Sequence, residues 1–136
     1  MIHASCVAYR GRAVLLLGAS GSGKSALALQ LMALGAGLVS DDRTILSVQK
    51  GALIASVPDS IAGRIEARGI GILAAEQHPP TPVALAVDLD WQETARLPER
   101  HEIELMGQSV LLLGAVAAPH FPAAILQMLA RERSAP

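Results

Sequence analysis

Aromatic residues and cysteine are scarce in this sequence, and their scarcity excludes several functions. Among 136 residues there is one Phe, one Trp and one Tyr, so the chain lacks the aromatic platforms on which single-stranded nucleic acids stack. The only cysteine, Cys6, cannot form an internal disulfide and has no Cys or His partner at metal-ligand spacing. We therefore expect Cys6 to be a small buried residue.

A strong net charge and a long apolar run are also missing. The net charge is -1, which gives no signature of polyanion binding, so we expect no nucleic-acid partner. No apolar run approaches the roughly 20 residues that span a bilayer, and no charged segment precedes an apolar stretch at the N-terminus. We expect a cytoplasmic protein without membrane association. Its hydrophobic content of 51% excludes a disordered chain, and its length fits a single domain over residues 1–136.

The hydrophobic pattern predicts many strands and few helices. The continuous apolar run at 13–17 predicts a buried, central strand, and residues 26–34 predict a helix because apolar residues occur on every face without a β-branched residue. Further strands are expected at 2–9, 38–40, 44–48, 53–57, 83–89, 103–105 and 109–113, and a second helix at 123–133. Residues 61–75 fit neither periodicity and are interpreted as loop and strand. The predicted fold class is α/β, with a mixed, twisted sheet.

A phosphate-binding motif follows the predicted central strand. Its residues match the pattern G-x-x-x-x-G-K-[ST] and are Gly18, Ala19, Ser20, Gly21, Ser22, Gly23, Lys24 and Ser25. The motif lies between a strand and a helix, as its mechanism requires, because backbone N–H groups and the helix N-terminus then face a phosphate. Lys24 would neutralise the β- and γ-phosphates, and the Ser25 hydroxyl would reach Mg²⁺. We expect a P-loop that binds a nucleoside triphosphate.

An acidic pair, Asp41 and Asp42, directly follows the predicted strand at 38–40. That strand can run beside the P-loop strand, which would bring both carboxylates to the nucleotide. One carboxylate can hold Mg²⁺, and the other can accept a proton from an attacking hydroxyl or water. The alternative is a solvated turn that leads into the next hairpin.

These motifs, with three further segments, resemble the catalytic domain of the HPr kinase/phosphorylase family. His3 stands upstream of the P-loop, which is similar to the family's G-x-S-G-x-G-K-S form, and Asp41-Asp42-Arg43 matches its acidic pair. The segment Glu66-Ala67-Arg68-Gly69-Ile70-Gly71-Ile72-Leu73 is similar to the family signature Glu-x-Arg-Gly-Leu-Gly-Ile, which is far rarer than a P-loop. Arg96-Leu97 is similar to the Arg-Leu of the catalytic loop. The resemblance covers about residues 2–113.

The resemblance implies a fold, a reaction and a role for each matching residue. The family has a P-loop domain related to phosphoenolpyruvate carboxykinase, and it transfers phosphate from ATP to a serine of the phosphocarrier protein HPr, which regulates a phosphotransferase system and carbon metabolism. Many members also reverse the reaction with inorganic phosphate. By resemblance, Asp42 would accept the serine proton and donate a proton in the reverse reaction, and His3 would orient or charge-balance the acidic pair. Arg96 would contact the transferred phosphoryl group or the attacking phosphate. Ser25, Asp41 and Glu66 would bind Mg²⁺.

The sequence also departs from the long members of the family. Their N-terminal domain and their longer C-terminal helical extension have no counterpart, so we expect a short form and a homo-oligomer of undetermined size. Ala19 replaces a common Asp, and Pro98 stands where the catalytic loop usually has Gly, which leaves the reverse reaction open. Two other functions stay open as well: a small-molecule kinase that uses the same P-loop, and a nucleotide-sensing module that transfers no phosphate.

Overall fold

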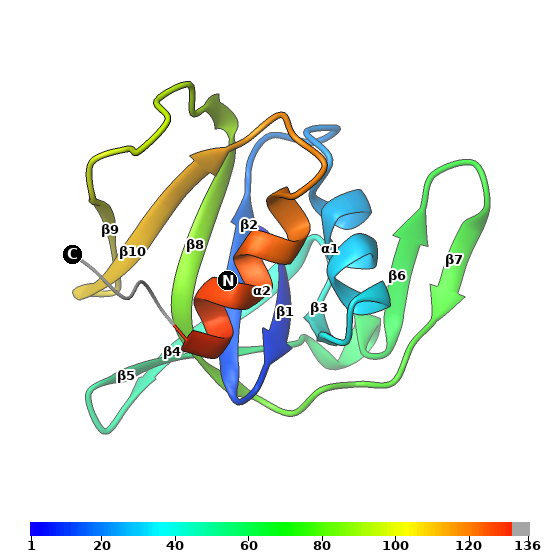
Figure 1. The fold of residues 1–136 in the computed structure, drawn as a ribbon. Helices are drawn as coiled ribbons and strands as arrows, with labels where there is room; N and C mark the ends of the chain where they lie inside the picture. Colours follow the sequence, from blue (N-terminus) through cyan, green and yellow to red (C-terminus); the bar gives the residue numbers. More distant parts are fainter. Residues whose placement is uncertain (132–136) are drawn as a thin grey trace.

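The computed structural model describes residues 1–131, which form ten strands and two α-helices (Figure 1). In chain order the elements are β1 (Ile2–Tyr9), β2 (Arg12–Leu17), α1 (Lys24–Ala33), β3 (Gly37–Ser40), β4 (Arg43–Gln49), β5 (Ala52–Ser56), a 3-10 turn (Asp59–Ile61), β6 (Arg64–Ala67), β7 (Gly71–Ala74), β8 (Thr81–Gln92), β9 (His101–Leu105), β10 (Gln108–Ala115) and α2 (Phe121–Arg131). The expected helix end at residue 133 lies outside the described residues. Every predicted strand and both predicted helices are present; the strand at 2–9 has the predicted ends, and the other elements are shifted at one or both ends.

Most strands belong to one eight-stranded, mixed sheet. The order is β2-β1-β4-β5-β8-β10-β9, with β3 paired to β1. Strand β8 runs parallel to both β2 and β10, and the other neighbours are antiparallel. Because β2 pairs with β8 as well as with β1, the path β2-β1-β4-β5-β8 closes into a ring. The predicted α/β class with a mixed sheet is confirmed.

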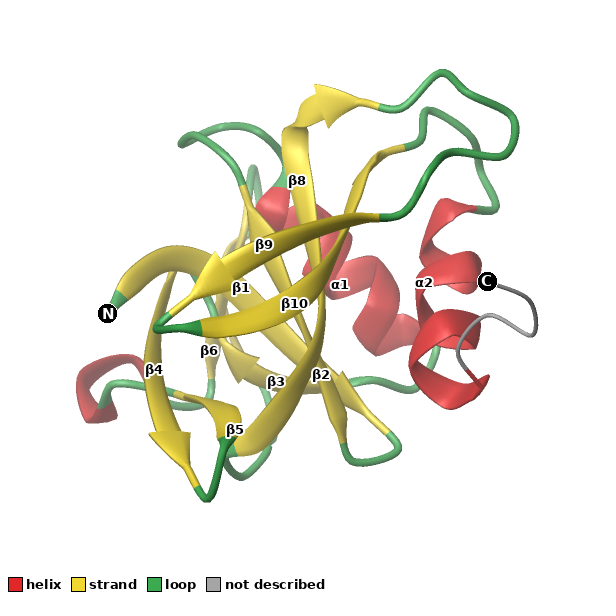
Figure 2. Ribbon diagram, turned by 90° about the vertical axis from the view of Figure 1, so that its left-hand side faces the viewer, coloured by secondary structure: helices red, strands yellow, loops and turns green. Residues whose placement is uncertain are grey.

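The sheet buries apolar side chains on both of its faces. Both helices lie on one side of the strands (Figure 2). On that side Val14 and Leu16 of β2 pack with Leu31 of α1 and with residues of α2. Leu15, between them, points to the opposite side, into a second core enclosed by the curved sheet, where Cys6 is fully buried as expected. Burial of a leucine side chain stabilises the fold by about 1.5 to 3 kcal/mol. The continuous apolar run of β2 therefore favours a central strand, where side chains on both faces are buried.

Strand β3 does not lie where the sequence placed it. The expectation that it runs beside the strand before the glycine-rich loop is wrong, since β1 separates it from β2. The other edge of β2 is occupied by β8. However, β1 is antiparallel to both β2 and β3, so β2 and β3 run in the same direction. Their carboxyl ends, which carry the glycine-rich loop and the acidic pair, therefore meet at the same edge of the sheet.

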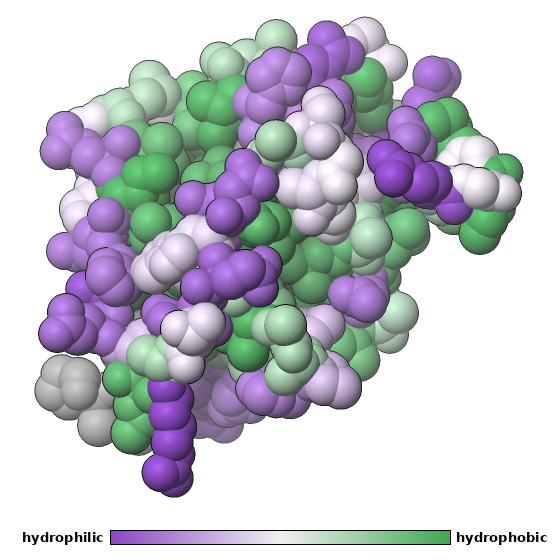
Figure 3. Space-filling view, turned by 90° about the horizontal axis from the view of Figure 1, so that it is seen from above, coloured by the Kyte–Doolittle hydropathy of each residue, from purple (hydrophilic) through white to green (hydrophobic). Residues whose placement is uncertain are grey.

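The segment of unclear periodicity forms a two-stranded hairpin, β6–β7, apart from the main sheet. At its tip Ile70 N donates a hydrogen bond to Ala67 O (2.9 Å), and Gly69 has a φ of +84°, a turn conformation that favours glycine. Ile65 and Ala67 are buried, and β6 packs against α1. The hairpin is thus attached by one face and projects from the body beside α1 (Figures 1 and 3).

Candidate active site

The glycine-rich loop, residues 18–25, curls tightly between β2 and α1. Gly21 and Gly23 have φ values of +82° and +101°, which side-chain-bearing residues rarely adopt. Ser22 N donates to Ala19 O (3.0 Å) inside the loop. From outside, Asp90 of β8 fixes the loop, because its Oδ2 accepts a hydrogen bond from Ala19 N (2.9 Å). The loop conformation is therefore set by glycines and by the neighbouring strand.

The interior of this loop suits an anion. Lys24 is 6% exposed, and its ammonium donates to the carbonyl oxygens of Gly18 (2.8 Å) and Ala19 (3.0 Å). Helix α1 has neither a side-chain cap nor an acidic residue in its first turn, and the buried Ser22 Oγ has no hydrogen-bond partner. A buried cation, an uncapped helix N-terminus and an unpartnered hydroxyl fit a polyphosphate.

Asp41 is a buried carboxylate held by three elements of the fold. Its Oδ1 accepts hydrogen bonds from Ser25 Oγ of α1 (2.6 Å) and from Ser5 Oγ of β1 (2.8 Å). Its Oδ2 accepts one from Glu66 N of β6 (3.0 Å). For Asp41 the alternative of a solvated turn is therefore wrong. Ser5 was not predicted as a site residue, and its only signal in the sequence is a hydroxyl within an otherwise apolar strand.

Asp42 differs from its neighbour in both exposure and backbone conformation. Its side chain is exposed, and its φ is +67°, which is uncommon for a residue with a side chain. Arg43 N donates to Asp41 O (2.7 Å) across it, the pattern of a classic γ-turn, which is rare and strained. The backbone N–H of Asp42 donates to Ser5 Oγ (3.1 Å). Strain of this kind concentrates at functional sites.

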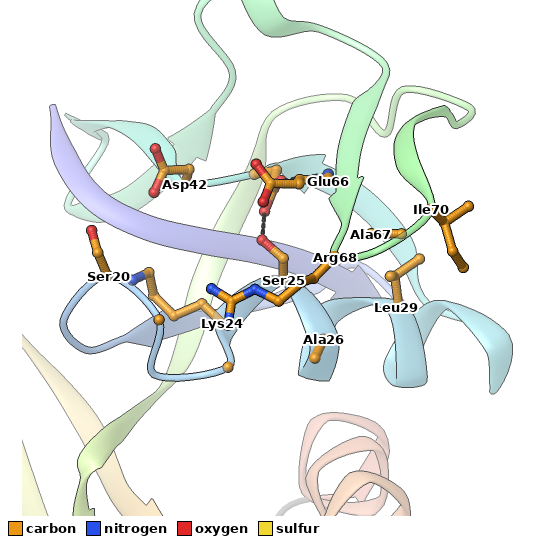
Figure 4. A pocket seen from close by; sticks show the side chains of 13 residues that line it. Ser20, Lys24, Ser25, Ala26, Leu29, Asp42, Glu66, Ala67, Arg68 and Ile70 are labelled. Atoms are coloured by element: carbon orange, nitrogen blue, oxygen red, sulfur yellow. Dashed lines mark hydrogen bonds between the residues drawn. The ribbon is translucent and has the colours of Figure 1, made fainter.

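A cavity of about 630 Å³ brings these groups together (Figure 4). The loop, α1, the acidic pair and the β6–β7 hairpin contribute its lining residues, which are Ser20, Gly21, Gly23, Lys24, Ser25, Ala26, Leu29, Asp41, Asp42, Glu66, Ala67, Arg68 and Ile70. Ser20 and Asp42 lie at one end, and Leu29 and Ile70 at the other (Figure 4). The cavity thus contains five of the eight predicted phosphate-binding residues and the predicted acidic residues, together with Arg68, to which sequence reasoning gave no role of its own.

Two predicted site residues lie elsewhere. His3 is exposed on β1, where it pairs with Arg43 of β4, the residue after Asp42. Arg96 is exposed in the loop between β8 and β9. Neither residue lines the cavity, and within residues 1–131 no hydrogen bond joins either of them to the acidic pair.

The acidic residues do not form a metal site by themselves. In the described part of the chain, no group of three or more His, Cys, Asp or Glu is arranged to hold a metal ion. Mg²⁺ is usually bound by one or two carboxylates together with substrate phosphates and water. Asp41 with Ser25, beside the exposed Glu66, fits a Mg²⁺ ion of that kind.

Within residues 1–131 no helix has the length and hydrophobicity to cross a membrane.

Comparisons with known proteins relate this cavity to one family. Residues 1–78 match the family described as HPr Serine kinase C-terminal domain. The chain is 40% identical over 76 residues to the HPr kinase/phosphorylase of a Clostridium botulinum strain and 46% identical over 72 residues to that of Caldicellulosiruptor bescii. These alignments cover 56% and 52% of this chain but only 25% and 23% of the relatives. Arg96 lies beyond the matched segment.

The likeness in structure extends further than the likeness in sequence. The fold resembles the solved structure of the Hpr(Ser) kinase/phosphatase from Coxiella burnetii, with a TM-score of 0.77 and 25% identity. That similarity covers 96% of this chain and 87% of the other. The three strands and the helix after residue 78 are thus also similar to those of that protein.

Proposed function

Since the chain belongs to the HPr serine kinase C-terminal domain family, we propose that it is an ATP-dependent kinase that phosphorylates a serine of an HPr-type phosphocarrier protein. The chain spans only about a quarter of the length of the curated relatives it matches. The substrate and the reaction are therefore proposed for this chain from its own residues as well as from the family.

The single observation that carries the proposal is the convergence of Lys24, Asp41 and Asp42 on one cavity. In this proposal the glycine-rich loop is a P-loop, and Lys24 with the loop amides holds the phosphates of ATP. Asp41 and Ser25, with Glu66 beside them, would hold Mg²⁺, which would neutralise charge on the phosphates.

Asp42 is the proposed general base. As the serine oxygen bonds to the γ-phosphorus, its proton passes to the Asp42 carboxylate, the bond from the γ-phosphorus to the bridging oxygen breaks, and ADP leaves. The contrast between the two carboxylates supports this division of roles. Asp41 has its oxygens occupied by three hydrogen bonds, whereas the exposed Asp42 faces the cavity from a strained turn. A module that only senses nucleotide would need no such base.

The proposal is tested by incubating the protein with labelled ATP, Mg²⁺ and either HPr or its counterpart from the nitrogen phosphotransferase system. We expect phosphoserine on one of these carriers and none on a carrier whose acceptor serine is replaced by alanine. Label that appears only on small molecules would instead identify a small-molecule kinase, and binding of ATP without transfer would identify a sensing module.

Several finer statements stay proposals of the same kind. A relation to the phosphoenolpyruvate carboxykinase fold and a homo-oligomeric state rest on the family resemblance, and a cytoplasmic location rests on the sequence pattern. The roles of His3 and Arg96 also rest on resemblance. The reverse reaction is tested by supplying phosphorylated HPr and inorganic phosphate and measuring pyrophosphate.

A further inference from the structure

Arg68 places a cation above the glycine-rich loop from a different part of the chain. Its guanidinium Nη2 lies 3.9 Å from the position that a Cβ atom would take on Gly21. Figure 4 shows the side chain leaving the hairpin and reaching back across the cavity toward Lys24 and Ser25. The cavity therefore has one cation inside the loop and a second one above it.

No protein group neutralises this second cation. Within residues 1–131 the Arg68 side chain takes part in no ion pair or hydrogen bond, and Glu66, two residues earlier on the same hairpin, does not pair with it. A guanidinium offers five N–H donors in a fork that matches phosphate geometry. An unpaired fork that lines a cavity beside a phosphate-binding loop is suited to an anionic ligand.

Strand β6 of the hairpin is held in place relative to the site. Ile65 and Ala67, which flank Glu66, are buried, and Glu66 N is bonded to Asp41 Oδ2 (3.0 Å). Arg68 follows immediately at the turn, so its Cα is held at a fixed place above the loop. The backbone at this position is therefore preorganised, and only the side chain would have to be ordered on binding a ligand.

We propose that Arg68 contacts the terminal phosphoryl group of the bound nucleotide and stabilises the charge on its equatorial oxygens during transfer. The inference rests on the proposed function, because it requires a nucleoside triphosphate in the cavity. Charge stabilisation by an arginine is a major part of catalysis in phosphoryl transfer. Arg68 and Arg96, the arginine suggested by family resemblance, are both exposed, but Arg68 lines this cavity and Arg96 does not.

The test compares Arg68→Ala with Arg64→Ala by titration calorimetry in the presence of Mg²⁺. Arg64 is a matched control, since it is an exposed arginine on β6 that does not line the cavity. The probes are ADP alone and ADP with aluminium fluoride, which mimics the transferred group. We expect Arg68→Ala to weaken binding of ADP with aluminium fluoride by about tenfold or more and to leave ADP binding unchanged. Arg64→Ala should match the wild type for both probes, and neither variant should shift the melting temperature.

Four outcomes would overturn the assignment. Equal affinities for the two variants would remove Arg68 from the site, and an equal loss for both probes would place it at the part of the nucleotide that ADP also contains. Weaker binding of HPr with unchanged nucleotide affinities would place Arg68 at the acceptor protein. If the wild type binds nucleotide but transfers nothing to HPr, the proposed function fails. The role of Arg68 is then still decided by how much Arg68→Ala weakens binding of ADP with aluminium fluoride relative to ADP alone. A wild type that binds neither probe refutes both proposals.

Discussion

Replacing Asp42 with asparagine tests the role of its carboxylate in proton transfer without a change in the stability of the fold, because the exposed carboxylate makes no contact within residues 1–131 that holds the fold together. Asparagine keeps the size of the side chain and tolerates the positive φ of +67° found at this position. The hydrogen bond from the backbone N–H of residue 42 to Ser5 Oγ does not involve the side chain. We therefore expect the folded structure and the melting temperature to stay as they are.

The rate of phosphoryl transfer should fall by far more than the stability. General-base assistance typically contributes about 10²- to 10⁴-fold, so transfer of label from ATP to HPr by Asp42→Asn should drop by that factor at saturating substrates. ATP affinity, measured by calorimetry, should persist because Lys24 and the loop amides are unchanged. A wild-type transfer rate in Asp42→Asn would refute the assignment of the base, even with the family membership intact.

Asp41→Asn is the matched control, and the structure predicts a different result for it. The amide oxygen must turn toward Glu66 N, since an NH₂ group there would place two donors face to face. The NH₂ group then faces the hydroxyls of Ser5 and Ser25, which lose their acceptor at Oδ1. Leaving buried donors unpaired costs about 1 to 3 kcal/mol, and each kcal/mol lowers the melting temperature of a chain of this size by roughly 3 to 5 °C. The Mg²⁺ concentration required for activity should also rise. If Asp41→Asn melts at the same temperature as Asp42→Asn and the wild type, the hydrogen bonds to Asp41 do not stabilise the fold as described.

Three further substitutions or reagents probe other groups. Lys24→Ala should abolish transfer and strongly weaken ATP binding, because the loop loses its charged contact to the phosphates; unchanged affinity by calorimetry would remove the P-loop assignment. If Arg96 contacts the phosphoryl group, as the family resemblance implies, Arg96→Ala should lower transfer at least about tenfold with an unchanged melting temperature, whereas early melting with normal turnover would show a structural role. Burial raises the pKa of the Cys6 thiol, so a thiol reagent at neutral pH should label Cys6 only after unfolding; rapid labelling of the folded protein would contradict the burial.

Local sequence patterns predicted which strands and helices form, but they did not predict which strands pair with one another. The apolar run of β2 and the glycines that follow it are properties of adjacent residues. The buried strand predicted from the apolar run is confirmed, and the P-loop predicted from the glycines stays a prediction. The position of β3 was wrong because the second edge of β2 is taken by β8, a pairing between distant segments that no local pattern encodes. Strand β8 also runs past its predicted end at residue 89, because Gln92 still pairs with Ala115 of β10.

The same distinction applies to the site. The loop and the acidic pair were predicted because each is a contiguous motif with known chemistry. Ser5 and Asp90 were not predicted, since a single hydroxyl or carboxylate in a strand has a function only through the partner that folding brings to it, here Asp41 and Ala19. Arg68 belonged to a recognised signature, but its direction into the cavity follows from the turn of the β6–β7 hairpin.

Strand β8, which closes the sheet, lies outside the segment whose sequence matches the family. The family match ends at residue 78, whereas β8 begins at Thr81 and supplies an edge partner to both β2 and β5. A fragment that ended with the matched segment would leave β2 with one edge unpaired and the second core exposed. Residues after 78 are therefore needed to complete the sheet that carries the glycine-rich loop, and the likeness in structure, which covers 96% of the chain, includes them.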